Sequence, residues 1–261
     1  MAQIRRCSII GACLTLMLAV AACSGSGSTQ GASSGGTTPT ASTSANGTLT
    51  IGLLGAPSSL NPATAPNGVF LYFLNPAYSS LTVAQPNGTI VPGLAASWRY
   101  LNANDTSFEF TLKPGFRYND GTPVTAQSAV NSLLYVKKNA AVIAADLMPY
   151  FSQIQATGPL TVRITLSNPV SNVPLLLSQL FGMGELISPA GLQHPAALGS
   201  NTFGAGPYEL DTSATINNST YTYVPNPHFP DPSQRHWQKI VLKIIPTPSS
   251  LLAAVESNQV Q

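Results

Sequence analysis

The stretch FEFTLKPGFRYNDGTPVT, residues 108–125, decides the fold that we expect for this chain. Over residues 107–112 three apolar side chains alternate with polar ones, which is typical of a strand with one buried face. The Lys-Pro-Gly that follows ends the strand. The NDGTP segment then predicts a turn in which Asp120 bonds its own backbone and the glycine takes a positive φ. Thr125 is placed to be the N-cap of a helix.

Further strand and helix patterns lie on both sides of this stretch and indicate a mixed α/β body over residues 47–261. The helix after Thr125 is expected to bury one side that includes Leu134. A second, short buried helix is expected over residues 172–181, where four leucines gather. The other expected elements are strands at 48–54, 162–166, 206–210, 220–224 and 240–245 and a helix at 249–256.

The segment GTIVPGLAASW, residues 88–98, carries a break at Pro92 and Gly93 followed by small residues. Leu94 and Trp98 are four residues apart, so we expect both to be buried anchors on one helical turn. On that interpretation Trp98→Ala would cost about 3 to 5 kcal/mol of folding free energy.

The N-terminus predicts a secretion signal over residues 1–22, with Arg5 and Arg6 before an apolar run too short to be a permanent membrane span. The run ends Leu-Ala-Val-Ala-Ala before Cys23, a lipobox-like sequence that predicts lipid attachment at Cys23. An ordinary signal with a chance cysteine is the alternative. The paired arginines also leave twin-arginine export open, although the residues after them fit that pattern poorly.

Residues 23–46 are almost wholly Ser, Gly, Thr and Ala, which predicts a flexible tether behind the lipid anchor. A glycosylated stalk would have the same composition. Cys7 and Cys13 leave with the signal, so no cysteine remains for a disulfide. Removal of Arg5 and Arg6 also leaves equal numbers of basic and acidic residues, which argues against nucleic-acid binding.

The sequence carries no recognisable catalytic, phosphate-binding or metal-binding motif. His194, His228 and His236 lie in loop-like, Pro-rich segments without helical spacing or a nearby carboxylate pair. We therefore expect no enzyme activity, no metal and no cofactor.

Several motifs, in order along the chain, are similar to those of one family, the bacterial extracellular solute-binding proteins of family 5. These are the oligopeptide, dipeptide and nickel binders of ABC importers. The matching segments are SLNP at 59–62, GTIVPGLAASW at 88–98, the stretch 108–125, ITLSNPV at 164–170, GPY at 206–208 and NP at 226–227. Most of these residues determine a fold, so they indicate the scaffold more strongly than the ligand.

Three departures from the family pattern stand out. Asn61 replaces an aspartate, and Ser128 replaces an acidic residue, which we expect to weaken the helix cap. The third is length, because family members run to about twice this size. The resemblance covers residues 48–261 and implies the N-terminal portion only.

The resemblance implies an α/β fold, the periplasmic-binding-protein-like type II (cluster C) scaffold, here a truncated N-terminal lobe without the second lobe. The family binds solutes in the cleft between its lobes, by backbone groups and aromatic walls. By analogy Thr64, Pro66, Asn67, Gly68 and Tyr150 would face that cleft. A plain surface turn remains open for Pro66 and Asn67, and an ordinary half-buried tyrosine for Tyr150.

The implied function is the substrate-binding component of an ABC importer, a monomer lipid-anchored at the outer face of the cytoplasmic membrane. Its partners would be a peptide or similar small solute and the permease subunits. Because half of the clamp is missing, we expect this chain to bind its solute weakly. A non-transport surface lipoprotein for adhesion or signalling is the alternative, and a hydrolase is a distant third.

Overall fold

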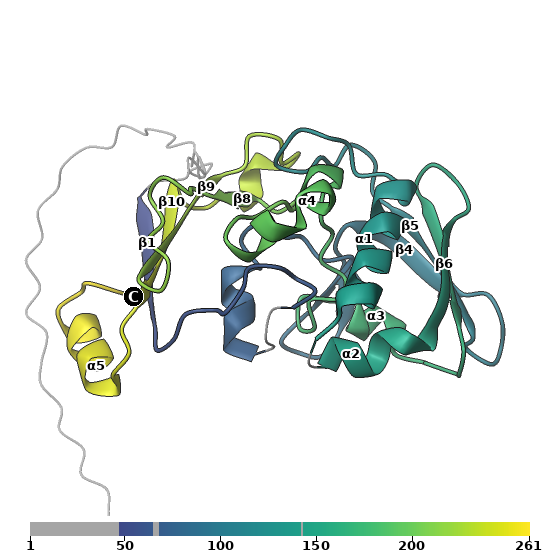
Figure 1. The fold of residues 1–261 in the computed structure, drawn as a ribbon, viewed down its shortest axis with the longest axis horizontal. Coiled ribbons are helices and arrows are strands. Elements are labelled where there is room, and N and C mark those ends of the chain that lie inside the picture. The colour runs from purple at the N-terminus through teal and green to yellow at the C-terminus, as the bar shows by residue number, and fades with distance from the viewer. Residues whose placement is uncertain (1–46, 65–67, 142) are drawn as a thin grey trace, which may run out of the picture. The chain divides into compact units, whose positions relative to one another are not determined.

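The structure is a computed structural model that describes residues 47–64, 68–141 and 143–261 (Figure 1). The predictions for the signal at residues 1–22, for Cys23 and for the tether lie outside the described residues. Within the described ranges, no helix combines the length and apolar character needed to cross a bilayer.

Strands and short helices alternate along the described part of the chain. The strands are β1 (Thr48–Leu53), β2 (Thr82–Ala84), β3 (Ile90–Pro92), β4 (Ala95–Tyr100), β5 (Ser107–Leu112), β6 (Phe151–Ala156), β7 (Thr161–Leu166), β8 (Tyr208–Leu210), β9 (Thr220–Pro225) and β10 (Lys239–Ile244). The α-helices are α1 (Ala126–Asn139), α2 (Ile143–Leu147), α3 (Val173–Leu176), α4 (Pro189–Gln193) and α5 (Pro248–Glu256). The 3-10 helices are η1 (Gly68–Phe73), η2 (Met148–Tyr150), η3 (Pro195–Gly199) and η4 (Pro232–Gln234).

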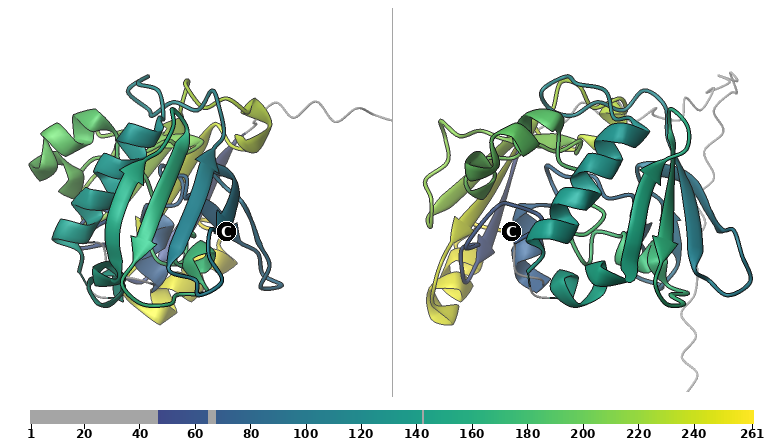
Figure 2. Two further views of the ribbon diagram at one scale, coloured as in Figure 1. Left: turned by 90° about the vertical axis from the view of Figure 1, so that its right-hand side faces the viewer. Right: turned by 45° about the vertical axis from the view of Figure 1, so that its right-hand side comes forward.

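One four-stranded sheet, which we name the contiguous sheet, has the order β4-β5-β7-β6 and is antiparallel throughout. The buried face predicted for residues 107–112 is confirmed, since Phe108, Phe110 and Leu112 are buried, although Glu109 on the opposite face is also only 9% exposed. Figure 2 shows α1 packed along one face of this sheet. The opposite face is polar, as is common when only one face of an antiparallel sheet meets a core.

The turn that leads into α1 has the predicted chemistry. The Thr122 amide donates to Asp120 Oδ1 at 2.9 Å, and Gly121 has φ +81°. Asp120 is therefore used as a turn residue, as the sequence indicated.

The N-terminus of α1 is closed by two reciprocal hydrogen bonds. The Ser128 amide donates to Thr125 Oγ1 at 3.1 Å, and the Thr125 amide donates to Ser128 Oγ at 2.9 Å. The expectation that Ser128 weakens this cap is wrong, because its hydroxyl accepts the bond that a carboxylate would accept. The predicted buried side of the helix is also too wide, since Leu134 is 44% exposed.

The second four-stranded sheet, which we name the split sheet, has the order β1-β10-β9-β8. β1 pairs in parallel with β10, in the register Leu49 with Ile240, and the other pairs are antiparallel. This sheet therefore joins the first described strand to three strands from the other end of the chain. All five strands predicted outside the stretch 108–125, and the helix at 249–256, are confirmed to within two residues at either end.

The segment around Trp98 is a strand and not a helical turn, so that prediction is wrong. Residues 95–100 form β4, in which Trp98 lies opposite Phe110 of β5. Small residues such as Ala95 permit either conformation, and pairing with β5 decides between them. Leu94 is buried as expected, but Trp98 lies on an edge strand and is only half-buried.

The helix expected over residues 172–181 is reduced to the single turn α3. The Ser178 hydroxyl donates to the Leu175 carbonyl at 2.6 Å, the acceptor that the next helical amide would need. Leu180 is 49% exposed, so the leucine cluster is only partly buried.

Two apolar cores result from this arrangement. One lies between the contiguous sheet and α1, and the other lies between the split sheet and η1. Trp98 packs against the first core, Trp237 against the second, and Tyr135 of α1 against both.

Candidate functional site

The parallel pair β1 and β10 places two carboxyl ends at one edge of the split sheet. In open α/β sheets such an edge is the usual place for a ligand, because the loops leave it in different directions. After β1 the chain runs into residues 54–61, and after β10 it runs into α5. In Figures 1 and 2, η1 lies between α5 and α2 on this side of the molecule.

A hollow of about 480 Å³ lies at this edge, and we name it the carboxyl-edge hollow. Its lining is mostly apolar and comes from the end of β1, from η1 and from α5, namely Gly52, Leu53, Leu54, Gly55, Phe70 and Leu251. A Cβ at Gly52 would clash with Leu251 Cδ1. The glycine therefore lets α5 approach β1 closely.

The SLNP turn, residues 59–62, follows β1 and is held by its own side chains. The Asn61 amide donates to Ser59 Oγ at 3.1 Å, and the Ala63 amide donates to Asn61 Oδ1 at 3.0 Å. Asn61 Nδ2 also donates to the Tyr135 hydroxyl at 2.9 Å. The Tyr135 hydroxyl can act as donor or acceptor, and here it accepts from the Asn61 amide, which ties the turn to α1.

The five predicted ligand contacts are only partly described. Thr64 is half-buried, and its hydroxyl donates to Ser59 Oγ at 3.2 Å. Pro66 and Asn67 lie outside the described residues, and Gly68 is the first residue of η1. Tyr150 ends η2 and is 39% exposed. Among the described residues, no hydrogen bond joins Thr64 to Tyr150.

Large apolar side chains are exposed on the elements that surround the carboxyl-edge hollow. Leu54 is 51% exposed, Tyr72 of η1 56%, and Leu252 and Val255 of α5 60% and 47%. Scattered exposed apolar residues are ordinary, but these share the elements around one hollow, as residues of an interaction surface do. Sequence reasoning identified the turn and missed this group, because α5 was not expected to pack beside β1.

The comparison with protein families decides the identity of this scaffold. A family model described as "Bacterial extracellular solute-binding proteins, family 5 Middle" matches residues 89–261. The chain belongs to this family. The resemblance carried by the motifs is therefore confirmed, and the family is one of solute-binding proteins.

Two curated relatives of this family-5 protein come from Escherichia coli K12. The probable D,D-dipeptide-binding periplasmic protein DdpA is 31% identical over 211 residues, which are 76% of this chain and 39% of DdpA. The periplasmic murein peptide-binding protein MppA is 26% identical over 205 residues, which are 70% of this chain and 37% of MppA. The chain thus spans less than half of the length of either relative.

Solved structures share the fold. The structure of the solute-binding protein MoaA from A. tumefaciens R10 in complex with mannopinic acid has a TM-score of 0.71 and 24% identity, and the match covers 83% of this chain and 44% of MoaA. The prediction of an α/β, periplasmic-binding-protein-like scaffold that corresponds to only part of such a protein is confirmed.

A buried carboxyl group lies beneath the SLNP turn of this family-5 protein. Glu185 is 0% exposed, and neither carboxyl oxygen has a hydrogen-bond partner among the described residues. A Cβ built on Gly182 would lie 3.4 Å from the Pro62 carbonyl and 3.8 Å from Glu185 Oε2, so the carboxyl group is close to the turn. Burial raises the pKa of Glu185 well above its ordinary value. An acidic residue in the otherwise apolar segment 183–187 was the signal that could have identified it.

The histidines do not form a metal site in the described part of the chain. No group of three or more His, Cys, Asp or Glu side chains there is arranged to hold a metal ion. His194 ends α4, and His228 and His236 lie in the loop between β9 and β10.

Proposed function

We propose that this family-5 protein is the solute-capturing part of an ABC importer receptor that takes peptides or similar small solutes and delivers them to a permease. Membership of the family over residues 89–261 carries this proposal. It is supported by the names of DdpA and MppA, which bind a D,D-dipeptide and murein peptides respectively.

The carboxyl-edge hollow would supply one wall of the ligand site. Its apolar lining suits solute side chains, and the SLNP turn that follows β1 is held by its own side-chain hydrogen bonds. We propose Thr64, Pro66, Asn67, Gly68 and Tyr150 as ligand contacts around this wall, with residues of a longer protein forming the opposite wall.

Peptide binding by this chain alone should be weak, because one wall makes only part of the contacts. Micromolar affinity corresponds to about 8 kcal/mol, and half of that corresponds to roughly millimolar binding. Titration of the chain from residue 24 with a dipeptide and a mixed tripeptide pool, followed by NMR of the backbone amides, tests this. We expect saturable chemical-shift changes around residues 54–64, with a dissociation constant in the millimolar range. Saturable binding tighter than about 10 µM would contradict a one-walled site.

A matched pair of variants locates the peptide site. Thr64→Val removes one hydroxyl at the proposed site with little change of shape, and should weaken the peptide response. Thr165→Val makes the same change on β7 of the contiguous sheet and should leave the response unchanged. Equal effects of the two variants, or shifts confined to the contiguous sheet, would refute this location.

We also propose that the protein is anchored by lipid at Cys23 outside the cytoplasmic membrane. The lipobox-like sequence and the Ser/Gly-rich tether support this, as do the periplasmic relatives. Metabolic labelling with a palmitate analogue should mark the wild type and not Cys23→Ala. An unlabelled wild type would disprove the anchor.

The alternative, a surface lipoprotein without a transport role, makes a different genetic prediction. A receptor of an importer should be encoded beside permease and ATPase genes, and its deletion should reduce uptake of the solute. Normal uptake in a deletion strain would favour the alternative.

A further inference from the structure

A second hollow, of about 280 Å³, lies away from the carboxyl-edge hollow and shares no lining residue with it. We name it the Lys113 hollow, and its lining includes Lys113, Phe116, Ser79, Phe229 and Gln234. The lining comes from both halves of the molecule, by which we mean the contiguous sheet with its core and the split sheet with its core. Phe116 follows β5 of the first, and Phe229 follows β9 of the second. The hollow is thus formed only when the two halves pack together.

Lys113 is the one charged residue among those that line this hollow. It is half-buried, and its ammonium donates to the Pro92 carbonyl at a long 3.4 Å. The ion pairs in the described part of the chain join Arg99 and Arg163 to Glu109 and do not include Lys113. An ammonium whose one hydrogen bond among the described residues is long and weak favours an anion beside it.

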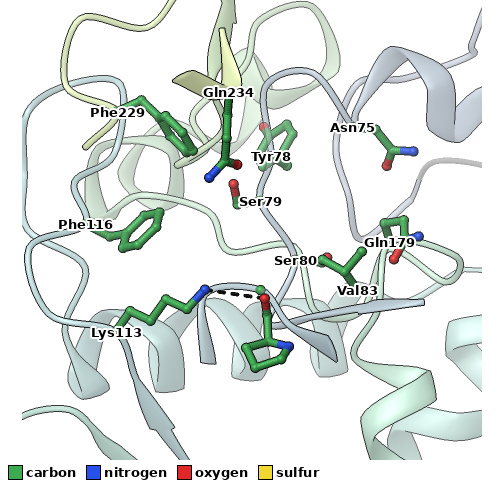
Figure 3. Close-up of a pocket in the computed structure, with 12 residues that line it drawn as sticks. Asn75, Tyr78, Ser79, Ser80, Val83, Lys113, Phe116, Gln179, Phe229 and Gln234 are labelled. Carbon is green, nitrogen blue, oxygen red and sulfur yellow. Dashed lines mark hydrogen bonds between the residues drawn. The ribbon is translucent and has the colours of Figure 1, made fainter. Parts of the chain in front are cut away.

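Two aromatic rings form an apolar wall next to this ammonium. Phe116 and Phe229 have centroids 5.7 Å apart at an interplanar angle of 81°, an edge-to-face pair. Figure 3 shows both rings on one side of the hollow, above the Lys113 ammonium. A flat apolar group would contact this wall while an attached anion reached Lys113.

The far side of the hollow carries polar, uncharged groups. Gln234 Nε2 donates to Asp231 Oδ2 at 2.8 Å through one of its two N–H groups, which leaves its second N–H and its carbonyl oxygen outside that bond. Figure 3 shows this amide and the Ser79 hydroxyl facing the hollow from the side opposite Lys113. The Asp231 carboxylate accepts from Gln234 and Ser233, is not among the residues that line the hollow, and forms no ion pair with Lys113.

We propose that the Lys113 hollow binds a small organic carboxylate with a flat apolar body. The carboxylate pairs with the Lys113 ammonium, and the apolar body packs on Phe116 and Phe229. This site is separate from the proposed peptide site, and neither depends on the other.

Benzoate is the probe, with benzamide as a neutral ligand of the same shape and acetate as an anion without the apolar body. Titrations of the chain from residue 24, followed by NMR of the backbone amides, should give saturable benzoate binding with shifts at residues 79, 113, 116, 229 and 234. Benzamide and acetate should each bind about tenfold or more weakly. Equal affinity for benzamide would remove the role of the charge, and equal affinity for acetate would remove the role of the wall.

Two lysine variants complete the test. Lys113→Met keeps the length of the side chain and should weaken benzoate binding about tenfold. Lys138→Met, at an exposed position in the last turn of α1, should change nothing. Unchanged melting temperatures establish that both variants are folded. Wild-type benzoate affinity in folded Lys113→Met, or no saturable benzoate shift up to about 20 mM, would overturn the proposal.

Discussion

The contiguous sheet takes all four of its strands from residues 95–166, whereas the split sheet joins β1 to strands from the other end of the chain. The first sheet joins two hairpins, β4–β5 and β6–β7, through the antiparallel pair β5–β7 and has α1 over one face. The second depends on the long-range parallel pair β1 and β10. Pairing strands that are far apart in sequence requires the closure of a long loop, and this entropy is lost before the contacts form. The second sheet therefore has the larger entropic cost of assembly.

The two sheets also differ in how completely their apolar residues are covered, and this difference bears on where a ligand is expected to bind. The contiguous sheet has a closed core and a polar outer face, and the elements around the end of the split sheet carry exposed apolar residues. Ligand sites are commonly found on the parts of a fold that are less completely packed.

The largest expected effect is in the core of the contiguous sheet. Phe110→Ala should cost about 3 to 5 kcal/mol of unfolding free energy, because Phe110 lies on a central strand and is 1% exposed. Leu242→Ala, equally buried in the split sheet, should cost less, since fewer atoms are removed. Urea unfolding measures both. A larger loss for Leu242→Ala would mean that packing in the split sheet, and not the number of atoms removed, determines the cost.

Glu185→Gln should stabilise the protein at pH 8 by about 1 kcal/mol or more, the scale of a one-unit pKa shift, because an amide carries no charge that folding must bury or neutralise. The folded state raises the pKa of Glu185, so it holds this proton more tightly than the unfolded chain does. The stabilisation that comes from this tighter proton binding is complete below the ordinary glutamate pKa of about 4.3. It is lost as the pH rises through the folded-state pKa.

The advantage of Glu185→Gln should therefore disappear near pH 4. Unfolding curves at several pH values test this, with the exposed Glu256→Gln of α5 as the control. A variant whose advantage does not change with pH would show that this carboxyl group does not titrate differently on folding.

Tyr223→Phe tests how the split sheet is joined to η1. The Tyr223 hydroxyl is buried and donates to the Phe73 carbonyl at 2.5 Å. Its removal should cost about 1 to 2 kcal/mol, because a buried acceptor loses its partner. Hydrogen exchange should increase in η1 and not in the contiguous sheet; equal increases in both would mean that the two halves open together.

The smallest effect is expected on the polar face of the contiguous sheet. Hydrogen bonds from Arg99 and then Arg163 lower the pKa of Glu109, so its contribution is present at neutral pH and is lost as the pH falls through the folded-state value. The Arg99 side chain is 72% exposed, so solvent screens the pair. Glu109→Gln should cost at most about 1 kcal/mol, and less at high salt. A loss that salt does not reduce would contradict a screened pair.

Local patterns predicted the elements that local physics determines. The alternation in residues 107–112, the Asp120 turn and the Thr125 cap each depend on residues a few positions apart. Trp98 shows where this fails, because partner strand β5 selects the strand over a helical turn. The pairing of β1 with β10 had no local signal at all.

Of the candidate site, only the SLNP turn was predictable from the sequence. The SLNP segment identified the residues after β1, since Asn and Ser side chains that bond nearby amides are visible in the sequence. The unpartnered carboxyl group of Glu185 and the approach of α5 to Gly52 depend on contacts between distant segments. The Lys113 hollow is likewise lined by segments that precede α1 in the sequence and by segments that follow it.

The placement of the two tryptophans, one against each core, makes the halves optically distinct. Trp98→Phe leaves Trp237 as the only indole fluorophore, which reports on the split sheet, and Trp237→Phe leaves Trp98, which reports on the contiguous sheet. Emission from each single-tryptophan chain can therefore be followed through the same denaturant series. Coincident transitions would establish that the body unfolds as one cooperative unit, and separated ones would give each half its own midpoint.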